Sequence, residues 1–241
     1  MTMEKKLLLS IICATYNHEK YLKFALDGIL MQKTNFQYEV LIGEDCSTDE
    51  SKRILKEYEH KYPGYFTIFY REKNYGIDQN FNDLYKKAHG KYVIVLETDD
   101  FWIDPYKLQK EVDFLEDHPE FIAVSHRCIM VNEENRPLGI QYPECHAREY
   151  TFRHFRKSLL PGQTTTLMYR NIHNDNSEGK FQLIDDKKYS VGAGDRRKVF
   201  ALLANGKIAC LPDVMSVYRY ITEKGSSYSA NVREDYKGKL Y

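Results

Sequence analysis

The chain has 241 residues and a mass of 28.5 kDa, with 42% hydrophobic and 29% charged residues. This size and composition suit one globular α/β unit and exclude an intrinsically disordered chain. Lys and Arg together number 35, as do Asp and Glu, so the formal net charge is zero and no overall basic field favours nucleic acid as a partner.

The apolar run at residues 7–14 follows two lysines, as the core of a signal peptide would. It is short and lacks an A-x-A pattern, so we interpret it as a first strand. No apolar run reaches the ~18 residues of a membrane helix, so we expect a cytoplasmic protein, compatible with peripheral association at the inner membrane face. Five cysteines without a C-x-x-C pair fit a reducing compartment. The residues His126, Cys128, Cys145 and His146 are zinc-type ligands at a spacing that matches no standard zinc site.

Four short apolar runs predict strands that are covered on both faces, at residues 7–14, 38–43, 66–70 and 92–96. Helical periodicity lies between them and predicts helices over about residues 18–32, from residue 47 onward, and over 78–89. Strand and helix alternate strictly, which favours right-handed crossovers and a parallel sheet.

Capping signals define the expected helix starts. Asn17 is the predicted N-cap of the first helix, and the Ser-Thr-Asp-Glu sequence at residues 47–50 predicts a capping box for the second. Asp104 and Pro105 are expected at the N-cap and first position of a fourth helix.

The pattern changes near residue 118. Strand-like segments then occupy residues 121–131, 164–170, 207–211 and 214–220, with one helix over about 195–205. We therefore expect an α/β fold whose first half, residues 1–118, is mainly parallel and whose second half, residues 119–241, is mixed α+β.

Two of the predicted strands end in acidic residues. Glu44 and Asp45 follow the second strand, and Glu97, Asp99 and Asp100 follow the fourth. If both strands flank the first, these acids converge at the carboxyl edge of the sheet, where open α/β sheets bind their ligands.

The turn after the first strand, residues 13–19, contains no glycine. Neither a dinucleotide fingerprint nor a P-loop is therefore present to hold phosphate with backbone N–H groups. An acidic crevice binds a diphosphate only if a divalent cation bridges the two, and Mg²⁺ or Mn²⁺ suits that task. Tyr16, in the same turn, could stack on a nucleotide base.

These acids also have structural alternatives. Asp45 could merely cap the second helix, and Asp100 and Asp104 could be turn residues. Glu97 and Asp99 together at a buried strand end would be costly without a counter-ion, which favours a bound partner.

With these motifs in hand, the sequence resembles glycosyltransferase family 2, which has the GT-A fold. The matching segments are "LSIICATYN" (9–17), "EDCSTD" (44–49), "NYGIDQNFNDLYKKAHGKY" (74–92) and "ETDDFW" (97–102), and the likeness continues to residue 121. Four motifs in the family's order are a more specific signal than any one alone.

The resemblance implies a metal-dependent, inverting enzyme that moves a sugar from a nucleotide-diphosphate-sugar to a glycan or lipid-linked acceptor. A UDP-sugar is the expected donor, Mg²⁺ or Mn²⁺ the expected cofactor, and bacterial surface polysaccharide synthesis the expected setting. Residues 1–118 would bind the nucleotide sugar, and residues 119–241 the acceptor, within one compact domain.

The resemblance also implies roles in nucleotide binding. Tyr16 would stack on the base, and Asp45 would accept a hydrogen bond from it. Glu44 and Asn74 would lie nearby, and Glu97 would meet the ribose or a metal-bound water.

Asp99, the last acid of the D-x-D pattern, would be the principal metal ligand. Asp195, at the start of the predicted helix, would take the proton of the acceptor hydroxyl as general base; the alternative is an N-cap paired to a neighbouring arginine. Asp100 and Trp102 are expected on the acceptor side, although a lone tryptophan is as often a core residue. The late family histidine is missing, and Arg219 might contact the diphosphate in its place.

Two other functions stay open on the sequence alone. A sugar-1-phosphate nucleotidyltransferase would need a glycine-rich first loop, which this chain lacks. A non-catalytic nucleotide-sugar or carbohydrate binding module would not need Asp195.

Overall fold

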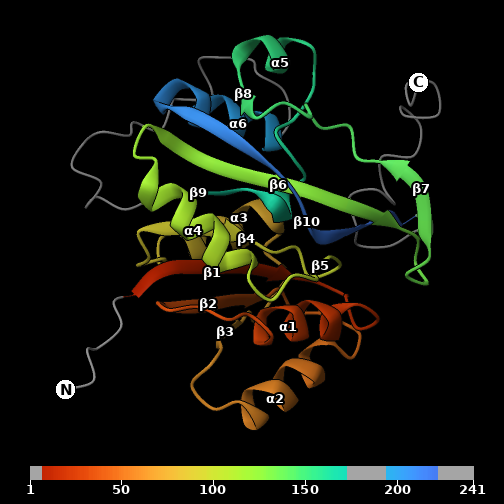
Figure 1. The fold of residues 1–241 in the computed structure, drawn as a ribbon. Coiled ribbons are helices and arrows are strands. Elements are labelled where there is room, and N and C mark those ends of the chain that lie inside the picture. Colours follow the sequence, from red (N-terminus) through yellow and green to blue (C-terminus); the bar gives the residue numbers. More distant parts are fainter. Residues whose placement is uncertain (1–6, 173–193, 222–241) are drawn as a thin grey trace.

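One ten-stranded sheet runs through both halves of the computed structural model, which describes residues 7–172 and 194–221 (Figure 1). The strands are β1 (Leu7–Thr15), β2 (Gln37–Glu44), β3 (Thr67–Tyr70), β4 (Tyr92–Val95), β5 (Phe101–Trp102), β6 (Phe121–Val131), β7 (Pro137–Gln141), β8 (Glu149–Tyr150), β9 (Met168–Arg170) and β10 (Lys207–Arg219). Their order is β3-β2-β1-β4-β9-β6-β10-β5, with β7 paired to β6 and β8 to β10.

Helices cover both faces of this sheet. They are α1 (Leu22–Leu30), α2 (Ser51–Lys61), α3 (Ile77–Tyr85), α4 (Lys107–Asp117), α5 (Phe152–Arg156) and α6 (Gly194–Asn205), with a short 3₁₀ helix, η1 (Thr164–Thr166). None of the described helices is both long and apolar enough to cross a membrane.

The parallel part of the sheet is as predicted. β1 lies between β2 and β4 and pairs in parallel with both, and β2 pairs in parallel with β3. In register, Thr15 lies opposite Glu44, and Ile12 lies opposite Val95, so these strands end along one edge. The expectation that the two acid-terminated strands flank the first is therefore confirmed.

Alternate residues of β1 face two separate cores. Leu9, Ile11 and Cys13 pack on the face covered by α1, α2 and α4. Ile12 packs on the opposite face with apolar residues of α3, α5 and α6, including Leu84. The sheet is thus buried on both faces, which explains its nearly continuous apolar strands.

The second half joins the same sheet through β9, which pairs antiparallel with both β4 and β6. The two strands predicted at 207–211 and 214–220 form one strand, β10, whose register to β6 shifts between Cys210 and Val214. Pro212 lies at this irregularity, where its missing N–H costs no ladder hydrogen bond. Residues 164–166 are helical rather than extended, because the Gln163 side chain accepts the Thr165 N–H and caps η1.

Two of the predicted N-caps are wrong. α1 begins at Leu22, and Asn17, with a φ of 55°, instead accepts the Thr48 N–H at 2.8 Å. The capping box expected at Ser47 is absent, since the Ser47 hydroxyl accepts the N–H of Asn17 at 3.1 Å, and α2 begins at Ser51. Both side chains tie the turn after β1 to the turn after β2.

The predicted cap of the fourth helix is displaced by two residues, from Asp104 to Tyr106. α4 begins at Lys107, and Asp104 accepts the N–H of Tyr106 at 2.8 Å in the turn that precedes it. Asp104 also contacts the ammonium of Lys110 at 2.8 Å.

A buried ion pair lies within α4, on the side of the helix that faces Trp102 of β5. The Nζ of Lys107 donates to Oε2 of Glu111 at 2.6 Å, and both side chains are fully buried. The ammonium also lies 4.6 Å from the centre of the Trp102 ring. Burial lowers the pKa of Lys107 and raises the pKa of Glu111 to about 7, so each charge depends on the other.

Removing one partner of the Lys107–Glu111 pair should destabilise the fold far more than removing both. We predict that Lys107→Met or Glu111→Leu alone lowers the free energy of unfolding by about 3 to 5 kcal/mol, because the remaining charge is buried without its partner. The double variant should recover most of this loss, as measured by urea denaturation. As a control, Arg53→Met in the exposed Arg53–Glu57 pair of α2 should cost roughly 0.5 kcal/mol or less. A double variant as unstable as the two single losses combined would contradict the pairing.

Candidate active site

The acidic loop after β4 is attached to the turn after β1 through Thr98. Its hydroxyl lies 2.7 Å from Nδ1 of His18, 3.1 Å from the Thr15 hydroxyl and 3.2 Å from the carbonyl oxygen of Ala14. Tyr16 lies in this turn and is partly exposed. Thr98, the second residue of "ETDD", therefore fixes the positions of Glu97 and Asp99 relative to the turn that carries Tyr16.

The residues predicted near the base form a second cluster, at the end of β2. Glu44 is fully buried, and its Oε1 accepts the Ser47 N–H at 2.6 Å. Asp45 accepts the N–H groups of Tyr75 and Gly76, both at 2.9 Å. Asn74 is exposed and also accepts the Gly76 N–H, at 2.8 Å. Asp45 therefore holds the "NYG" turn, which is a different structural role from the helix cap considered above.

Asp100 is the most constrained acid of the loop. It is 1% exposed and accepts hydrogen bonds from Nε2 of Gln163 at 2.8 Å, the hydroxyl of Thr165 at 3.2 Å and the backbone N–H of Arg219 at 2.8 Å. The same Nε2 of Gln163 donates to Oε2 of Glu97 at 3.0 Å. Gln163 thus holds Glu97 and Asp100 at a fixed separation, a contact that the sequence analysis missed.

The expected acceptor contact of Trp102 is not found. The side chain is 1% exposed, and its Nε1–H donates to the carbonyl of Thr165 at 3.3 Å. Helix α1 lies directly against this strand, since a Cβ on Gly28 would come within 3.0 Å of the Trp102 backbone nitrogen. Trp102 is therefore packed in the core of this structure, and Asp100 is equally buried.

Arg219 supports the backbone of the acidic loop. It is 1% exposed, and its Nε–H donates to the carbonyl of Asp99 at 2.9 Å. The guanidinium lies 4.3 Å from the centre of the Tyr21 ring and also contacts Phe24 and Phe101. Arg219, the last residue of β10, therefore links the end of this strand to Asp99 and Asp100 of the acidic loop.

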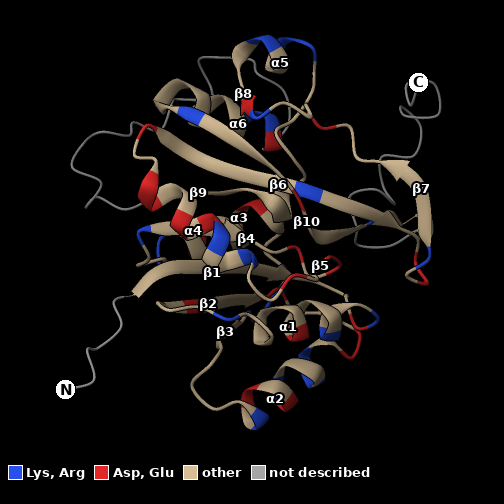
Figure 2. Cartoon of the chain, in the orientation of Figure 1, with Lys and Arg blue, Asp and Glu red and all other residues tan. Residues whose placement is uncertain are grey.

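Like charges dominate the electrostatics of the site. Burial, together with the charges of Asp99 and Asp195, raises the pKa of Glu97 to about 8. Burial and the charges of Asp99 and Glu97 raise the pKa of Asp100 well above its usual range. Burial lowers the pKa of Lys198, but Tyr85, Asp195 and Glu97 outweigh it, and the net pKa of Lys198 is raised. Figure 2 shows acidic segments in the loops beside β5.

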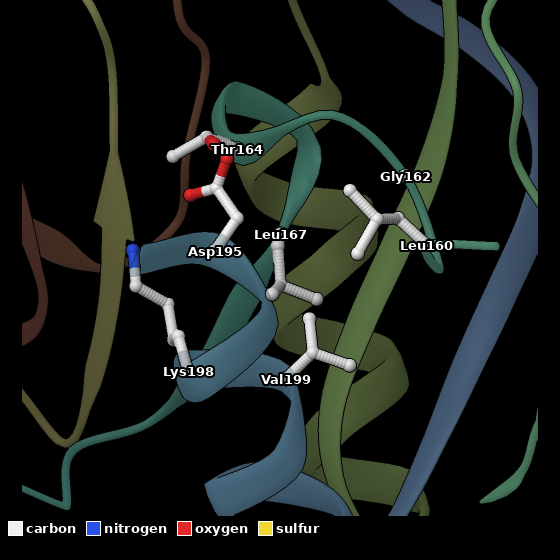
Figure 3. Close-up of a pocket in the computed structure, with 7 residues that line it drawn as sticks. All are labelled: Leu160, Gly162, Thr164, Leu167, Asp195, Lys198 and Val199. Atoms are coloured by element: carbon white, nitrogen blue, oxygen red, sulfur yellow. The ribbon is translucent and has the colours of Figure 1, made fainter. Parts of the chain in front are cut away.

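Asp195 and Lys198 line a pocket beside the acidic loop (Figure 3). Asp195 is exposed in the first turn of α6, as the sequence predicted, and both side chains point to the same side of the helix. The other lining residues are Leu160, Gly162, Thr164, Leu167 and Val199. The Asp195 carboxylate and the Lys198 ammonium share this pocket and lie close enough to Glu97 of the acidic loop to interact with it electrostatically.

The donor set fits a hard divalent cation with few protein ligands. Glu97 and Asp99 are partly exposed carboxylates in one loop, whereas the oxygens of Asp100 already accept three hydrogen bonds. Within residues 7–172 and 194–221, no group of three or more His, Cys, Asp or Glu side chains is arranged to hold a metal ion. Mg²⁺ and Mn²⁺ commonly complete such a site with water and substrate phosphate oxygens.

Comparison with known proteins identifies relatives of the chain. The profile described as "Glycosyl transferase family 2" matches residues 10–176. "Uncharacterized protein Rv1520" of Mycobacterium tuberculosis is 34% identical over 214 residues, which cover 88% of this chain and 58% of that protein. The "Putative teichuronic acid biosynthesis glycosyltransferase TuaG" of Bacillus subtilis is 34% identical over 110 residues, which cover 46% and 42%. The chain therefore spans only about half the length of these relatives.

Solved structures share the fold. TarS residues 1–349 of S. aureus, in complex with UDP-GlcNAc, gives a TM-score of 0.69 at 22% identity, covering 93% of this chain and 61% of that one. The mannosyltransferase PcManGT of Pyrobaculum calidifontis, in complex with GDP-Man and Mn²⁺, gives 0.61 at 20%, covering 88% and 57%. The predicted GT-A fold is thereby confirmed.

The crowded acids predict an unusual pH dependence of stability. Glu97 keeps its proton to about pH 8 when folded, against a reference pKa of 4.5, so the folded state binds more protons between these values. Stability therefore falls as pH rises through this window. In metal-free buffer, Glu97→Gln should be more stable than the parent protein at pH 8 by up to about 4 kcal/mol, with little difference at pH 5.

The measurement is denaturant unfolding of both proteins at the two pH values. Glu116→Gln is the control, because Lys91 and Tyr92 lower the pKa of Glu116 despite its partial burial. That variant should instead lose stability at pH 8. If Glu97→Gln were less stable than the parent protein at pH 8, ionised Glu97 would not destabilise the folded state, and the prediction would be wrong.

Proposed function

The chain belongs to glycosyl transferase family 2, and on that premise we propose that it transfers a sugar from a nucleotide-diphosphate-sugar to a hydroxyl of a glycan or lipid-linked acceptor, with inversion at C1. The observation that carries the proposal is the meeting of the acidic loop after β4 with Asp195 of α6 at the carboxyl edge of a GT-A sheet.

The donor would bind at the ends of β1 and β2. The partly exposed ring of Tyr16 offers a stacking surface for the base, and Asp45 fixes the turn at residues 74–76 beside it. Asn74 is exposed on that turn, and buried Glu44 braces the turn at Ser47. The UDP-GlcNAc bound by TarS supports a UDP-sugar as donor, and TuaG supports a role in bacterial surface polysaccharide synthesis.

Glu97 and Asp99 would hold Mg²⁺ or Mn²⁺, with Asp99 as the principal ligand. When bound, the cation would neutralise charge on the diphosphate leaving group. The Mn²⁺ in the PcManGT complex supports this assignment. Gln163 keeps Glu97 in place, and Arg219 fixes the backbone of Asp99, so both carboxylates are positioned before a ligand arrives.

Asp195 would act as general base. Its exposed carboxylate in the first turn of α6 would take the proton of the acceptor hydroxyl as the oxygen attacks C1 from the face opposite the diphosphate. The ammonium of Lys198, one turn further along, would offset part of the negative charge. Residues 1–118 would thus bind the donor, and residues 119–241 would supply the base and the acceptor surface.

Replacing Asp195 tests the proposed chemistry. We predict that Asp195→Asn lowers the turnover number about 10²- to 10⁴-fold, because the amide cannot accept the proton, while the affinity for the donor changes little. Release of nucleoside diphosphate would be measured with a panel of donors and acceptors, and donor affinity by calorimetry. The matched control is Asp213→Asn, an exposed acid of β10 that pairs with Lys110, which should keep full activity.

Unchanged turnover by Asp195→Asn would contradict the base assignment. Tight donor binding by the parent protein with no transfer to any acceptor would instead favour a non-catalytic binding module.

A further inference from the structure

Two cysteines lie together on the far side of the loop that carries Gln163. Cys145 follows β7, and Cys210 lies in β10, 65 positions later, yet their sulfur atoms are 3.5 Å apart. Both side chains are partly exposed and both are free thiols. Two backbone hydrogen bonds hold the segments in place: Cys145 N–H to Leu160 O at 3.1 Å, and Cys210 N–H to Arg148 O at 2.9 Å.

We propose that Cys145 and Cys210 form a reversible disulfide, and that this bond changes the conformation of the loop at residues 159–163. A disulfide requires a sulfur–sulfur distance of about 2.05 Å, so the two sulfur atoms must approach each other by roughly 1.5 Å. Rotation of the two side chains, with the segments already held by backbone hydrogen bonds, can supply much of that movement.

Cys145 is the better nucleophile of the pair. The hydrogen bond with Cys210 lowers the pKa of Cys145 to about 7, whereas that same hydrogen bond, with burial, raises the pKa of Cys210. A large part of Cys145 is therefore thiolate at neutral pH, and the thiolate is the form that attacks a disulfide.

Glutathione disulfide can serve as the oxidant. The Cys145 thiolate attacks one of its sulfur atoms, which forms a mixed disulfide and releases one glutathione thiolate. Cys210 then gives up its proton and attacks the Cys145 sulfur, which releases a second glutathione. The two protein thiols are oxidised by two electrons, and one glutathione disulfide is reduced to two glutathione molecules.

The consequence for the loop comes from the carbonyl of Pro161. That oxygen accepts a hydrogen bond from the Ser125 hydroxyl at 2.9 Å. It also accepts one from the Cys210 thiol at 3.5 Å. Cys210 has only one proton, so it serves either this carbonyl or the Cys145 sulfur at any moment. Oxidation removes the proton and ends the contact with Pro161.

Oxidation should also move Leu160. An isolated β-bridge pairs Leu160 with Glu144, which is the residue before Cys145. Gln163 follows two residues after Pro161 and holds both Glu97 and Asp100. Movement of the loop therefore reaches the acidic loop, and its effect on sugar transfer rests on the proposed function. The formation of the disulfide does not.

The test uses the whole chain in glutathione buffers of increasing oxidised fraction at pH 7.5. Peptide mass spectrometry without reduction should find Cys145 linked to Cys210, with the loss of two hydrogen masses, reversed by dithiothreitol. Cys145→Ser and Cys210→Ser should each abolish this species, whereas Cys128→Ser should keep it. Five unmodified thiols, or a different linked pair, would overturn the proposal.

A second measurement tests the loop. Hydrogen exchange of the amides in residues 159–163 should differ between the oxidised and reduced protein, and should not respond to the oxidant in Cys145→Ser. Unchanged exchange in a fully linked protein would overturn the conformational part of the proposal. Oxidation should lower the transfer rate roughly tenfold, as expected for a small displacement of positioning groups. If the reduced parent protein transfers no sugar, the proposed function fails while the disulfide result stands.

Discussion

The buried carboxylate of Asp100 joins three segments that are far apart in the sequence. It accepts hydrogen bonds from the loop before η1, through Gln163 and Thr165, and from the end of β10, through the backbone of Arg219. A buried carboxylate is stable only when donors surround it, so the acidic loop can adopt this conformation only when both segments are in place. The first half of the chain therefore depends on the second for the geometry of its own strand end.

This arrangement keeps like charges close together. The charges of Asp99 and Asp195 raise the cost of ionising Glu97, and the charge of Lys198 compensates only in part. Charge crowding of this kind lowers stability in the free protein and favours a cationic ligand. The same hydrogen bonds that hold the acids in place thus preserve a site whose missing counter-charge a metal ion would supply.

Local patterns were sufficient to predict the parallel sheet, the flanking positions of β2 and β4, and the position of Asp195 in the first turn of α6. Each depends on periodicity or on residues adjacent in sequence. The burial of Trp102 and Arg219 was not predicted, because it depends on the packing of α1 and of β10 against the acidic loop. The "GQTTT" run was expected on the acceptor side, but the contacts of Gln163 with Glu97 and Asp100 were not predicted, because they depend on how this loop packs against the acidic loop. The helix caps predicted at Asn17 and Ser47 were wrong, because each side chain accepts a hydrogen bond from the backbone of the other residue's turn and caps no helix.

The central claim is that the acids at this edge bind a nucleotide-diphosphate-sugar together with a divalent cation. Calorimetric titration of the chain with UDP- and GDP-sugars, with and without Mn²⁺, tests it most directly. The account predicts that at least one nucleotide sugar binds more tightly with Mn²⁺, and that Asp99→Asn removes this difference while the protein stays folded. Equal affinity with and without the metal for every nucleotide sugar would contradict it.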